Sequence, residues 1–349
     1  ESLLEVRELP WAMLGLGKAY YHLQQYAKAA DVLRRLIDSQ PMLVAAHDWL
    51  SLVLEKQGES KNAQEVLVQA LEHSPKSILR QRRLGEVALR NKDYNLAEKS
   101  FKLALRVGKG SCFRSPAEFA GLAHALIKKD APMEAAKLVD TMTREFREDP
   151  GDLLQVALVD AEVQQSLGNT ERGKQAAERA MQLFQERPDK VSSDLAMELA
   201  EVCFQQGSTD SARELLRHTL LNQHKDSVTQ QRVRDLFSAA GLASESQTLI
   251  DSTVREVAEI NNQGVRLARE GKLEEALRFF EKAVQAMPEN IQVNLNAAQS
   301  LVMFMRERGV NRAYIVKAEV YLDRVQAVDM TNSKCQKLKE MLGHLVVGK

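Results

Sequence analysis

Apolar and small residues recur along this chain of 349 residues at a regular interval of 34 positions. Five sets of positions follow the interval: Leu16, Leu50 and Leu84; Ala29, Ala63 and Ala97; Leu33, Leu67 and Phe101; Leu36, Ala70 and Ala104; Pro41 and Pro75. Small residues within each unit allow two antiparallel helices to pack closely, and a proline after the second helix prevents its continuation. The pattern therefore predicts a series of helical hairpins, one per repeat.

The register changes at several places further along the chain. It slips by four residues at 108–111, which predicts a longer loop, and looser hairpins then continue to residue 227. Between residues 228 and 256 the pattern is degenerate, with a turn at Gly241 followed by a long helix. A regular unit returns over 264–288, and the last unit carries about eight extra residues around 306–313 that would lengthen both of its helices. A terminal helix is predicted over 333–345.

The first hairpin resembles the tetratricopeptide repeat family. Its first helix contains Leu16-Gly17-Lys18-Ala19-Tyr20 and its second helix opens with Tyr26-Ala27-Lys28-Ala29-Ala30, in the order of the family pattern. The resemblance implies an all-α fold, a right-handed superhelix (α-solenoid) of about eight to nine hairpins with a C-terminal capping helix. We expect a single solenoid over residues 1–349, with sub-arrays over 1–227 and 257–349. The degenerate unit at 228–256 either continues one array or forms a hinge between the two sub-arrays.

Composition narrows the functional classes. Lys and Arg total 48 and Asp and Glu total 48, so no overall basic charge favours binding to nucleic acid or to an anionic membrane. The three cysteines, Cys112, Cys203 and Cys335, lack the spacing of a metal site, which is typical of a reducing, cytoplasmic location. No stretch has the length of a membrane span, and no signal peptide pattern opens the chain. Because the chain begins at Glu1 already in a helical pattern, we expect it to be a fragment of a longer protein.

The residue pattern does not support catalytic, metal or cofactor chemistry. The seven histidines are scattered, and the nearest pair, His218 and His224, lies six residues apart at the end of a helix. The segment Gly108-Lys109-Gly110-Ser111 lacks the first glycine of a phosphate-binding loop and follows a helix rather than a strand. We therefore expect a protein that is not an enzyme and binds no metal or cofactor.

A protein partner would bind to the first helices of the hairpins. The resemblance implies that these helices line a concave groove and that about the second, fifth, ninth and twelfth to thirteenth positions of each unit face inward. The candidate protein-binding residues are Lys18, Tyr21, His22, Asp48, Lys56, Arg82, Glu86, Arg90, His124 and Lys128. The alternative is that the apolar positions on this face only pack the helices together.

The third hairpin is strongly basic. Residues 76–109 contain ten Lys or Arg against Glu86, Asp93 and Glu98, a local net charge of +7. Such a segment in a neutral chain would attract an acidic partner, because Arg binds a carboxylate or phosphate with two parallel hydrogen bonds. The alternative is a solvated basic face without a ligand.

Three stretches carry a closer resemblance, to the C-terminal region of bacterial response regulators in which a receiver domain is fused to a tetratricopeptide array. They are Ala46-His47-Asp48-Trp49-Leu50, Ser74-Pro75-Lys76-Ser77-Ile78-Leu79-Arg80-Gln81-Arg82-Arg83-Leu84-Gly85 and Glu259-Ile260-Asn261-Asn262-Gln263-Gly264. The resemblance implies an output module in two-component signal transduction that binds another signalling protein, as a peptide or a folded domain. The alternatives are a scaffold for assembling an envelope, polysaccharide or secretion machine, and a regulator that senses a ligand. Self-association is compatible with all three.

Overall fold

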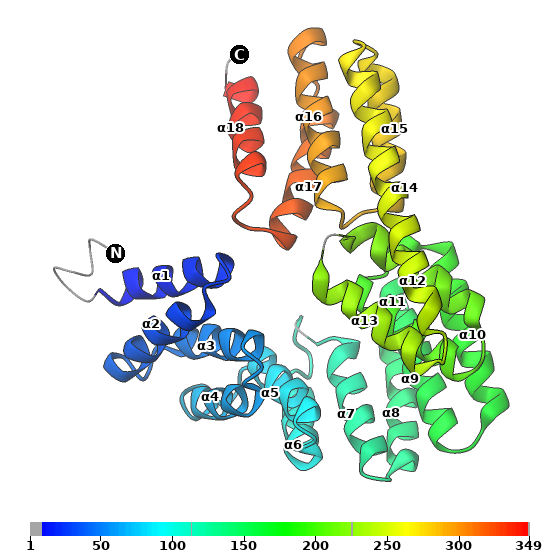
Figure 1. Cartoon of the computed structure of the whole chain (residues 1–349). Coiled ribbons are helices and arrows are strands. Elements are labelled where there is room, and N and C mark those ends of the chain that lie inside the picture. The colour runs from blue at the N-terminus through cyan, green and yellow to red at the C-terminus, as the bar shows by residue number, and fades with distance from the viewer. Residues whose placement is uncertain (1–8, 113, 225, 348–349) are drawn as a thin grey trace. The chain divides into compact units, whose positions relative to one another are not determined.

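The computed structural model describes residues 9–112, 114–224 and 226–347. These residues form eighteen α-helices and one short 3₁₀ helix, with no strand among them, so the predicted all-α fold is confirmed (Figure 1). The helical pattern at residues 1–8 lies outside the described ranges. The chain divides into two compact units, unit 1 over Glu1–Gly173 and unit 2 over Lys174–Lys349. Whether the array is continuous or hinged at 228–256 stays a prediction.

Unit 1 is a stack of helical hairpins, as the repeat interval predicts. Its first helices are α1 (Pro10–His22), α3 (Val44–Lys56), α5 (Ile78–Arg90), α7 (Pro116–Lys128) and α9 (Pro150–Ser166). Its second helices are α2 (Tyr26–Ser39), α4 (Ser60–His73), α6 (Tyr94–Val107) and α8 (Pro132–Glu145). From α1 to α9 each helix packs against the next, and Figure 1 shows the two helices of a hairpin running in opposite directions. The predicted loop at 108–111 lies between α6 and α7.

The chain reverses within each hairpin at one residue with left-handed backbone. Gln24, Gly58 and Lys92 take this position in the first three hairpins, 34 residues apart, with φ of 58°, 79° and 62°. Only one of the three is glycine, the residue that adopts this conformation without steric cost. The turn geometry therefore repeats at the same interval as the core, although its residue type does not.

Glycines in the first helices allow a bulky side chain from a second helix to lie against the backbone. A Cβ added at Gly17 would lie 2.7 Å from Leu33 Cγ, and one added at Gly85 would lie 2.6 Å from Phe101 Cε2. Gly121 on α7 faces the same fully buried Phe101 ring, so this ring packs between the backbones of two consecutive first helices. The small residues of the repeat thus set how closely its helices approach.

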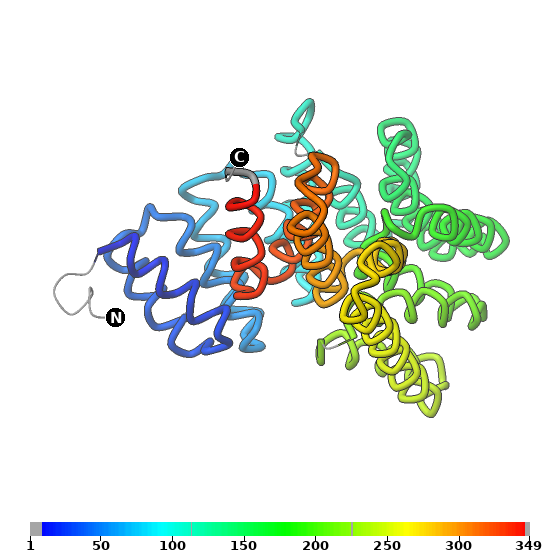
Figure 2. Tube along the Cα trace, turned by 90° about the horizontal axis from the view of Figure 1, so that it is seen from above, coloured from blue at the N-terminus to red at the C-terminus, as the bar shows by residue number. Residues whose placement is uncertain are grey.

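Unit 2 contains the remaining helices and departs from the regular repeat. Helix α10 (Thr170–Glu186) crosses the boundary between the units. The elements after it are η1 (Pro188–Lys190), α11 (Ser193–Gln205), α12 (Thr209–Gln223), α13 (Ser227–Ala239), α14 (Ala243–Arg269), α15 (Leu273–Ala286), α16 (Ile291–Arg308), α17 (Arg312–Val328) and α18 (Ser333–Val347). The long helix predicted after Gly241 is the 27-residue α14, which packs against both α13 and α15 (Figure 2).

The last unit has the features that its extra residues predict. Helices α16 and α17 have 18 and 17 residues, whereas α1 and α2 have 13 and 14. The predicted terminal helix is α18, which packs against α16 and α17. Its buried Cys335, Leu338 and Leu342 extend the core of unit 2. Helix α18 therefore covers apolar surface that the last hairpin would otherwise expose.

A contact that the repeat does not predict joins the α15–α16 loop to the end of α12. Asn290 donates through Nδ2 to the Leu221 carbonyl at 2.7 Å, and the Glu289 amide donates to Asn222 Oδ1 at 2.9 Å. Ser193 Oγ, at the start of α11, donates to Glu289 Oε2 at 2.6 Å. These partners lie 67 to 96 residues apart in sequence, so unit 2 is closed by contacts between non-consecutive hairpins.

We expect Gly121→Ala to lower the free energy of unfolding by about 1–3 kcal/mol, because the new methyl group would overlap the buried Phe101 ring. Gly15→Ala is the matched control, since Gly15 is also helical but has no atom within 4 Å of the added Cβ. Gly15→Ala should stabilise its helix by about 0.5–1 kcal/mol. Urea unfolding followed by circular dichroism measures the free energy of unfolding of both variants. Equal effects of the two substitutions would contradict the packing described for α5, α6 and α7.

Candidate protein-binding surface

Charged side chains on consecutive first helices of unit 1 pair across the hairpins. Arg80 of α5 donates to Asp48 of α3 with two bonds, Nε to Oδ1 at 2.7 Å and Nη2 to Oδ2 at 2.6 Å. This bidentate geometry fixes both side chains more firmly than a single contact would. Glu55, also on α3, accepts from Arg83 at 2.5 Å and from Arg90. We call this set of cross-hairpin pairs the polar ladder.

The ladder continues from α5 to α7 through a buried carboxylate. Glu118 is 1% exposed and lies in the first turn of α7, where its Oε2 accepts from the Ser115 amide at 3.0 Å and from Ser115 Oγ at 2.9 Å. Arg82 Nη1 donates to the other oxygen, Oε1, at 3.2 Å. A negative charge at a helix N-terminus is favourable, and Arg82 balances it from the neighbouring hairpin. Arg82 thereby satisfies a charge that burial would otherwise penalise.

The ladder reaches α9 through His124 and Glu162. His124 Nε2 of α7 lies 2.6 Å from Glu162 Oε2 of α9, and both side chains are partly exposed. The polar ladder thus connects α3, α5, α7 and α9 in order. Its members all lie on first helices of unit 1, and we call the exposed part of these helices the first-helix surface.

Aromatic rings extend this surface at α1, α3 and the start of α2. Tyr21, His22 and Tyr26 gather near Trp49, with ring centroids 5.5 Å apart for Tyr21 and Trp49, and 5.8 Å for His22 and Trp49. Lys18 Nζ lies 5.3 Å from the centre of the Trp49 ring, within the range of a cation–π contact. We call these five residues the aromatic platform. Tyr21, Tyr26 and Trp49 also pack against the core of the first hairpins, so only part of each ring is exposed.

The structure brings most of the sequence-predicted residues onto this one surface. Asp48, Arg82, Arg90 and His124 belong to the polar ladder, and Glu86 lies 3.9 Å from Arg82. Lys18, Tyr21 and His22 belong to the aromatic platform. Lys56 and Lys128 are exposed at the ends of α3 and α7. Their role in binding a partner stays a prediction.

The charge that the third hairpin offers to a partner is smaller than its sequence suggests. Arg80, Arg82, Arg83 and Arg90 all pair with carboxylates that lie outside residues 76–109, on α3 and α7. Lys102 pairs with Glu98 on α6. Four of the ten cations therefore pair with neighbouring hairpins of the stack, and the proposal of an acidic partner does not rest on the count of +7.

Sequence reasoning missed several members of the ladder and the platform. Arg80, Arg83, Glu118, Glu162 and Trp49 were outside the predicted set, although each contacts one of its members or neighbours. A signal for the pairs exists in the spacing, because opposite charges on first helices one repeat apart meet across hairpins. The Asp48–Arg80, Arg82–Glu118 and His124–Glu162 pairs are 32, 36 and 38 residues apart.

Other chemistry finds no site in the described part of the chain. Among residues 9–112, 114–224 and 226–347, no group of three or more His, Cys, Asp or Glu side chains could hold a metal ion. In these same ranges no helix combines the length and apolarity that crossing a bilayer requires. Burial raises the pKa of the Cys203 thiol to about 11, which keeps this thiol protonated and unreactive at neutral pH.

Two segments of the chain match family models described as tetratricopeptide repeat, residues 11–41 and residues 195–218. The first segment covers α1 and α2, and the second lies in α11 and α12, so one hairpin of each unit matches. These matches support the resemblance of the repeat to the tetratricopeptide family. None of the curated proteins matches this chain.

Several solved structures are similar at low identity. PilF of Pseudomonas aeruginosa is 19% identical with a TM-score of 0.42, covering 64% of this chain and 95% of its own. PilW, a type IV pilus biogenesis factor, is 16% identical with a TM-score of 0.44, covering 64% of this chain and 98% of its own. A tetratricopeptide repeat protein from Parabacteroides merdae is 10% identical with a TM-score of 0.41, covering 96% of this chain and 98% of its own. Similarity of this extent does not carry function from one protein to another.

We expect Arg82→Gln to lower the free energy of unfolding of unit 1 by about 1–3 kcal/mol, because Glu118 would lose its charged donor while remaining buried. Arg90→Gln is the control, since the Arg90 side chain is half exposed and its partner Glu55 keeps Arg83. Loss of such an exposed pair should cost less than about 1 kcal/mol. Urea unfolding at pH 7 compares the two variants. A larger effect of Arg90→Gln would mean that Glu118 does not depend on Arg82.

Proposed function

We propose that this chain is a non-catalytic scaffold that binds other proteins or peptides through the first-helix surface of unit 1. The observation that carries the proposal is the aromatic platform beside the polar ladder. Aromatic side chains contribute large contact areas at low entropic cost and are enriched among the residues that dominate protein interfaces. His22 of the platform and Lys56 at the end of α3 are exposed and have no ion pair within the described residues. They supply polar groups for a partner.

The fixed positions of the side chains on this surface also support the proposal. Asp48, Arg82 and Glu118 already hold their neighbours by hydrogen bonds and ion pairs before any partner arrives. A surface whose side chains are fixed in advance loses less conformational entropy on binding than a mobile one. The stacked hairpins would therefore present the aromatic platform in a defined orientation.

The specific function that we propose is the output module of a bacterial response regulator, acting in the cytoplasm on another signalling protein. Two of the three stretches that resemble such regulators meet in space, because Asp48 of the first stretch binds Arg80 of the second through two hydrogen bonds. The stretches therefore contribute jointly to the first-helix surface. The alternative proposal remains a scaffold for an envelope, polysaccharide or secretion machine.

Binding to the first-helix surface can be tested with a display library of random twelve-residue peptides selected on the full chain. We expect His22→Ala combined with Lys56→Ala to weaken the selected peptides about tenfold or more, because interface contacts of this kind contribute more than 1 kcal/mol. Fluorescence anisotropy with a labelled selected peptide measures the affinity. Both side chains are exposed, so the fold should be unchanged.

The matched control replaces two exposed residues of the second helix α4, Lys61→Ala combined with Glu65→Ala. This variant should bind the peptide within about twofold of the original chain, since neither residue lies on the first-helix surface. Peptides that bind all three proteins equally, or that are weakened only by the α4 change, would refute the proposed surface.

The specific role is tested by the coding sequence upstream of Glu1. A receiver domain with a phospho-acceptor Asp is the expected finding. A membrane anchor or secretion signal there would overturn the response-regulator proposal in favour of the assembly scaffold, and a DNA-binding domain would favour the ligand-sensing regulator.

A further inference from the structure

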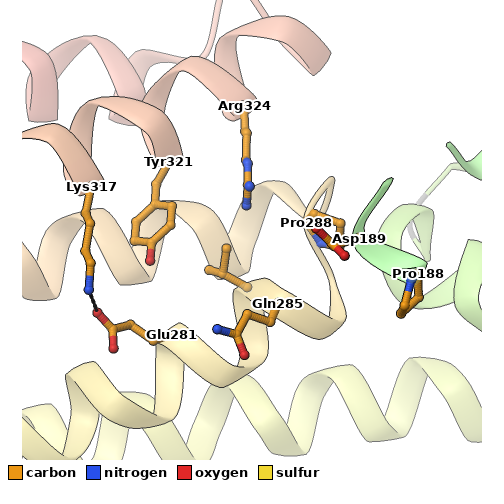
Figure 3. A pocket seen from close by; sticks show the side chains of 9 residues that line it. Pro188, Asp189, Glu281, Gln285, Pro288, Lys317, Tyr321 and Arg324 are labelled. Carbon is orange, nitrogen blue, oxygen red and sulfur yellow. Dashed lines mark hydrogen bonds and ion pairs between the residues drawn. The ribbon is translucent and has the colours of Figure 1, made fainter. Parts of the chain in front are cut away.

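Unit 2 contains a pocket of about 480 Å³ between the 3₁₀ helix η1 and the second helices α15 and α17. Figure 3 shows the side chain of Arg324 extending from α17 into the space above α15, with Tyr321 beside it and Gln285 opposite. The pocket lies on second helices and belongs to unit 2, so it is separate from the first-helix surface of unit 1.

Ion pairs neutralise every charged group at this pocket except one. Lys317 Nζ donates to Glu281 Oε1 at 2.6 Å, and this hydrogen bond raises the pKa of Lys317. Asp189 pairs with Arg187 at 3.1 Å, which lowers the pKa of its carboxyl group. Arg324 forms no ion pair or hydrogen bond with any described residue, although it is only partly exposed. Its guanidinium is therefore an uncompensated positive charge directed into the pocket.

Two further polar groups point into the same space without a protein partner. The hydroxyl of Tyr321 and the side-chain amide of Gln285 make no hydrogen bond with any residue in the described ranges. Burial raises the pKa of Tyr321, so its hydroxyl remains a hydrogen-bond donor at neutral pH. Buried or half-buried polar groups are normally paired. Gln285 is exposed to water, but Tyr321 is buried and Arg324 is half-buried. These two unpaired donors at one pocket indicate a ligand that accepts hydrogen bonds.

We propose that this pocket binds the carboxylate of an Asp or Glu side chain presented by an acidic segment of a partner protein. Arg324 would hold the carboxylate through two parallel hydrogen bonds, the geometry that a guanidinium and a carboxylate share. Tyr321 and Gln285 would donate to the remaining lone pairs. Val284 lines the pocket and would contact the methylene groups of the bound side chain.

The character of the pocket favours a peptide side chain over a free small molecule. Sites for small molecules are mostly apolar and enclose the larger part of their ligand. Here Asp189, Gln285 and Lys317 are exposed, and polar groups dominate the lining. Such a pocket can hold one planar charged group while the chain that carries the group remains in solvent. A single free cation also suits the one negative charge of a carboxylate better than the nearly two charges of a phosphate.

This pocket rests on the proposed protein-binding function and adds a second contact to it. The pocket proposal can be refuted while the proposal for the first-helix surface stands. Its probe is an acetylated and amidated heptapeptide, Gly-Ser-Gly-Glu-Gly-Ser-Gly, compared with the same peptide containing Gln in place of Glu. Titration into the full ¹⁵N-labelled chain should shift the Arg324 Nε–Hε signal and the backbone amides of α17 with the Glu peptide. The Gln peptide should cause no saturable shift.

The variant Arg324→Gln should weaken the Glu peptide about tenfold or more, as expected for the loss of a charge-assisted pair. Tyr321→Phe should weaken it about threefold, because one neutral donor is removed. Arg278→Gln is the matched control, since Arg278 lies on α15 but does not line the pocket. This variant should bind the Glu peptide with the same affinity as the original chain. Circular dichroism confirms that each variant is folded.

Three results would overturn the proposal. The first is equal affinity of the Glu peptide for the original chain and for Arg324→Gln. The second is equal binding of the Glu and Gln peptides. The third is inorganic phosphate binding at least tenfold more tightly than the Glu peptide, which would assign the pocket to a phosphate group. None of these results depends on His22 or Lys56, so they leave the first-helix surface untested and its proposal intact.

Discussion

The close approach of the two helices in each hairpin is the constraint on which the rest of this structure depends. Gly17, Gly85 and Gly264 leave space that Leu33, Phe101 and Phe280 fill from the second helices. A fully buried ring in such a space has no room to move, so it fixes the distance and rotation of both helices. In an array that is held mainly by neighbouring contacts, fixing each hairpin also fixes its relation to the next one.

Charged groups from different hairpins meet as a consequence of that repetition. Asp48 and Arg80 lie 32 residues apart, close to one repeat, and therefore occupy corresponding places on adjacent first helices. Partly exposed ion pairs contribute little to stability, except where one partner is buried as Glu118 is. Their larger effect is to hold the side chains of the first-helix surface in place. The aromatic platform is thus built on an ordered support, which links packing in the core to the proposed binding of proteins.

The sequence was sufficient for features that depend on local spacing. The hairpins, the loop at 108–111, the lengthened α16 and α17 and the terminal α18 all follow from the periodicity of small and apolar residues. The ladder partners were harder to predict, because four inserted residues move Glu118 away from the regular interval. The contact of Asn290 with the end of α12 and the pocket at Arg324 could not be predicted at all. They bring together residues that are not one repeat apart, and only the packing of unit 2 determines which of them meet.

The most direct test of the central claim is amide hydrogen exchange of the full chain with and without a peptide selected on it. A partner that binds the first-helix surface should slow exchange in α1, α3 and α5, whose side chains form the aromatic platform and the polar ladder. Exchange in α4 and α6 should change much less, because these second helices contribute neither to the polar ladder nor to the aromatic platform, whereas α2 carries Tyr26 of the platform. Protection concentrated in α4 and α6 would contradict the account.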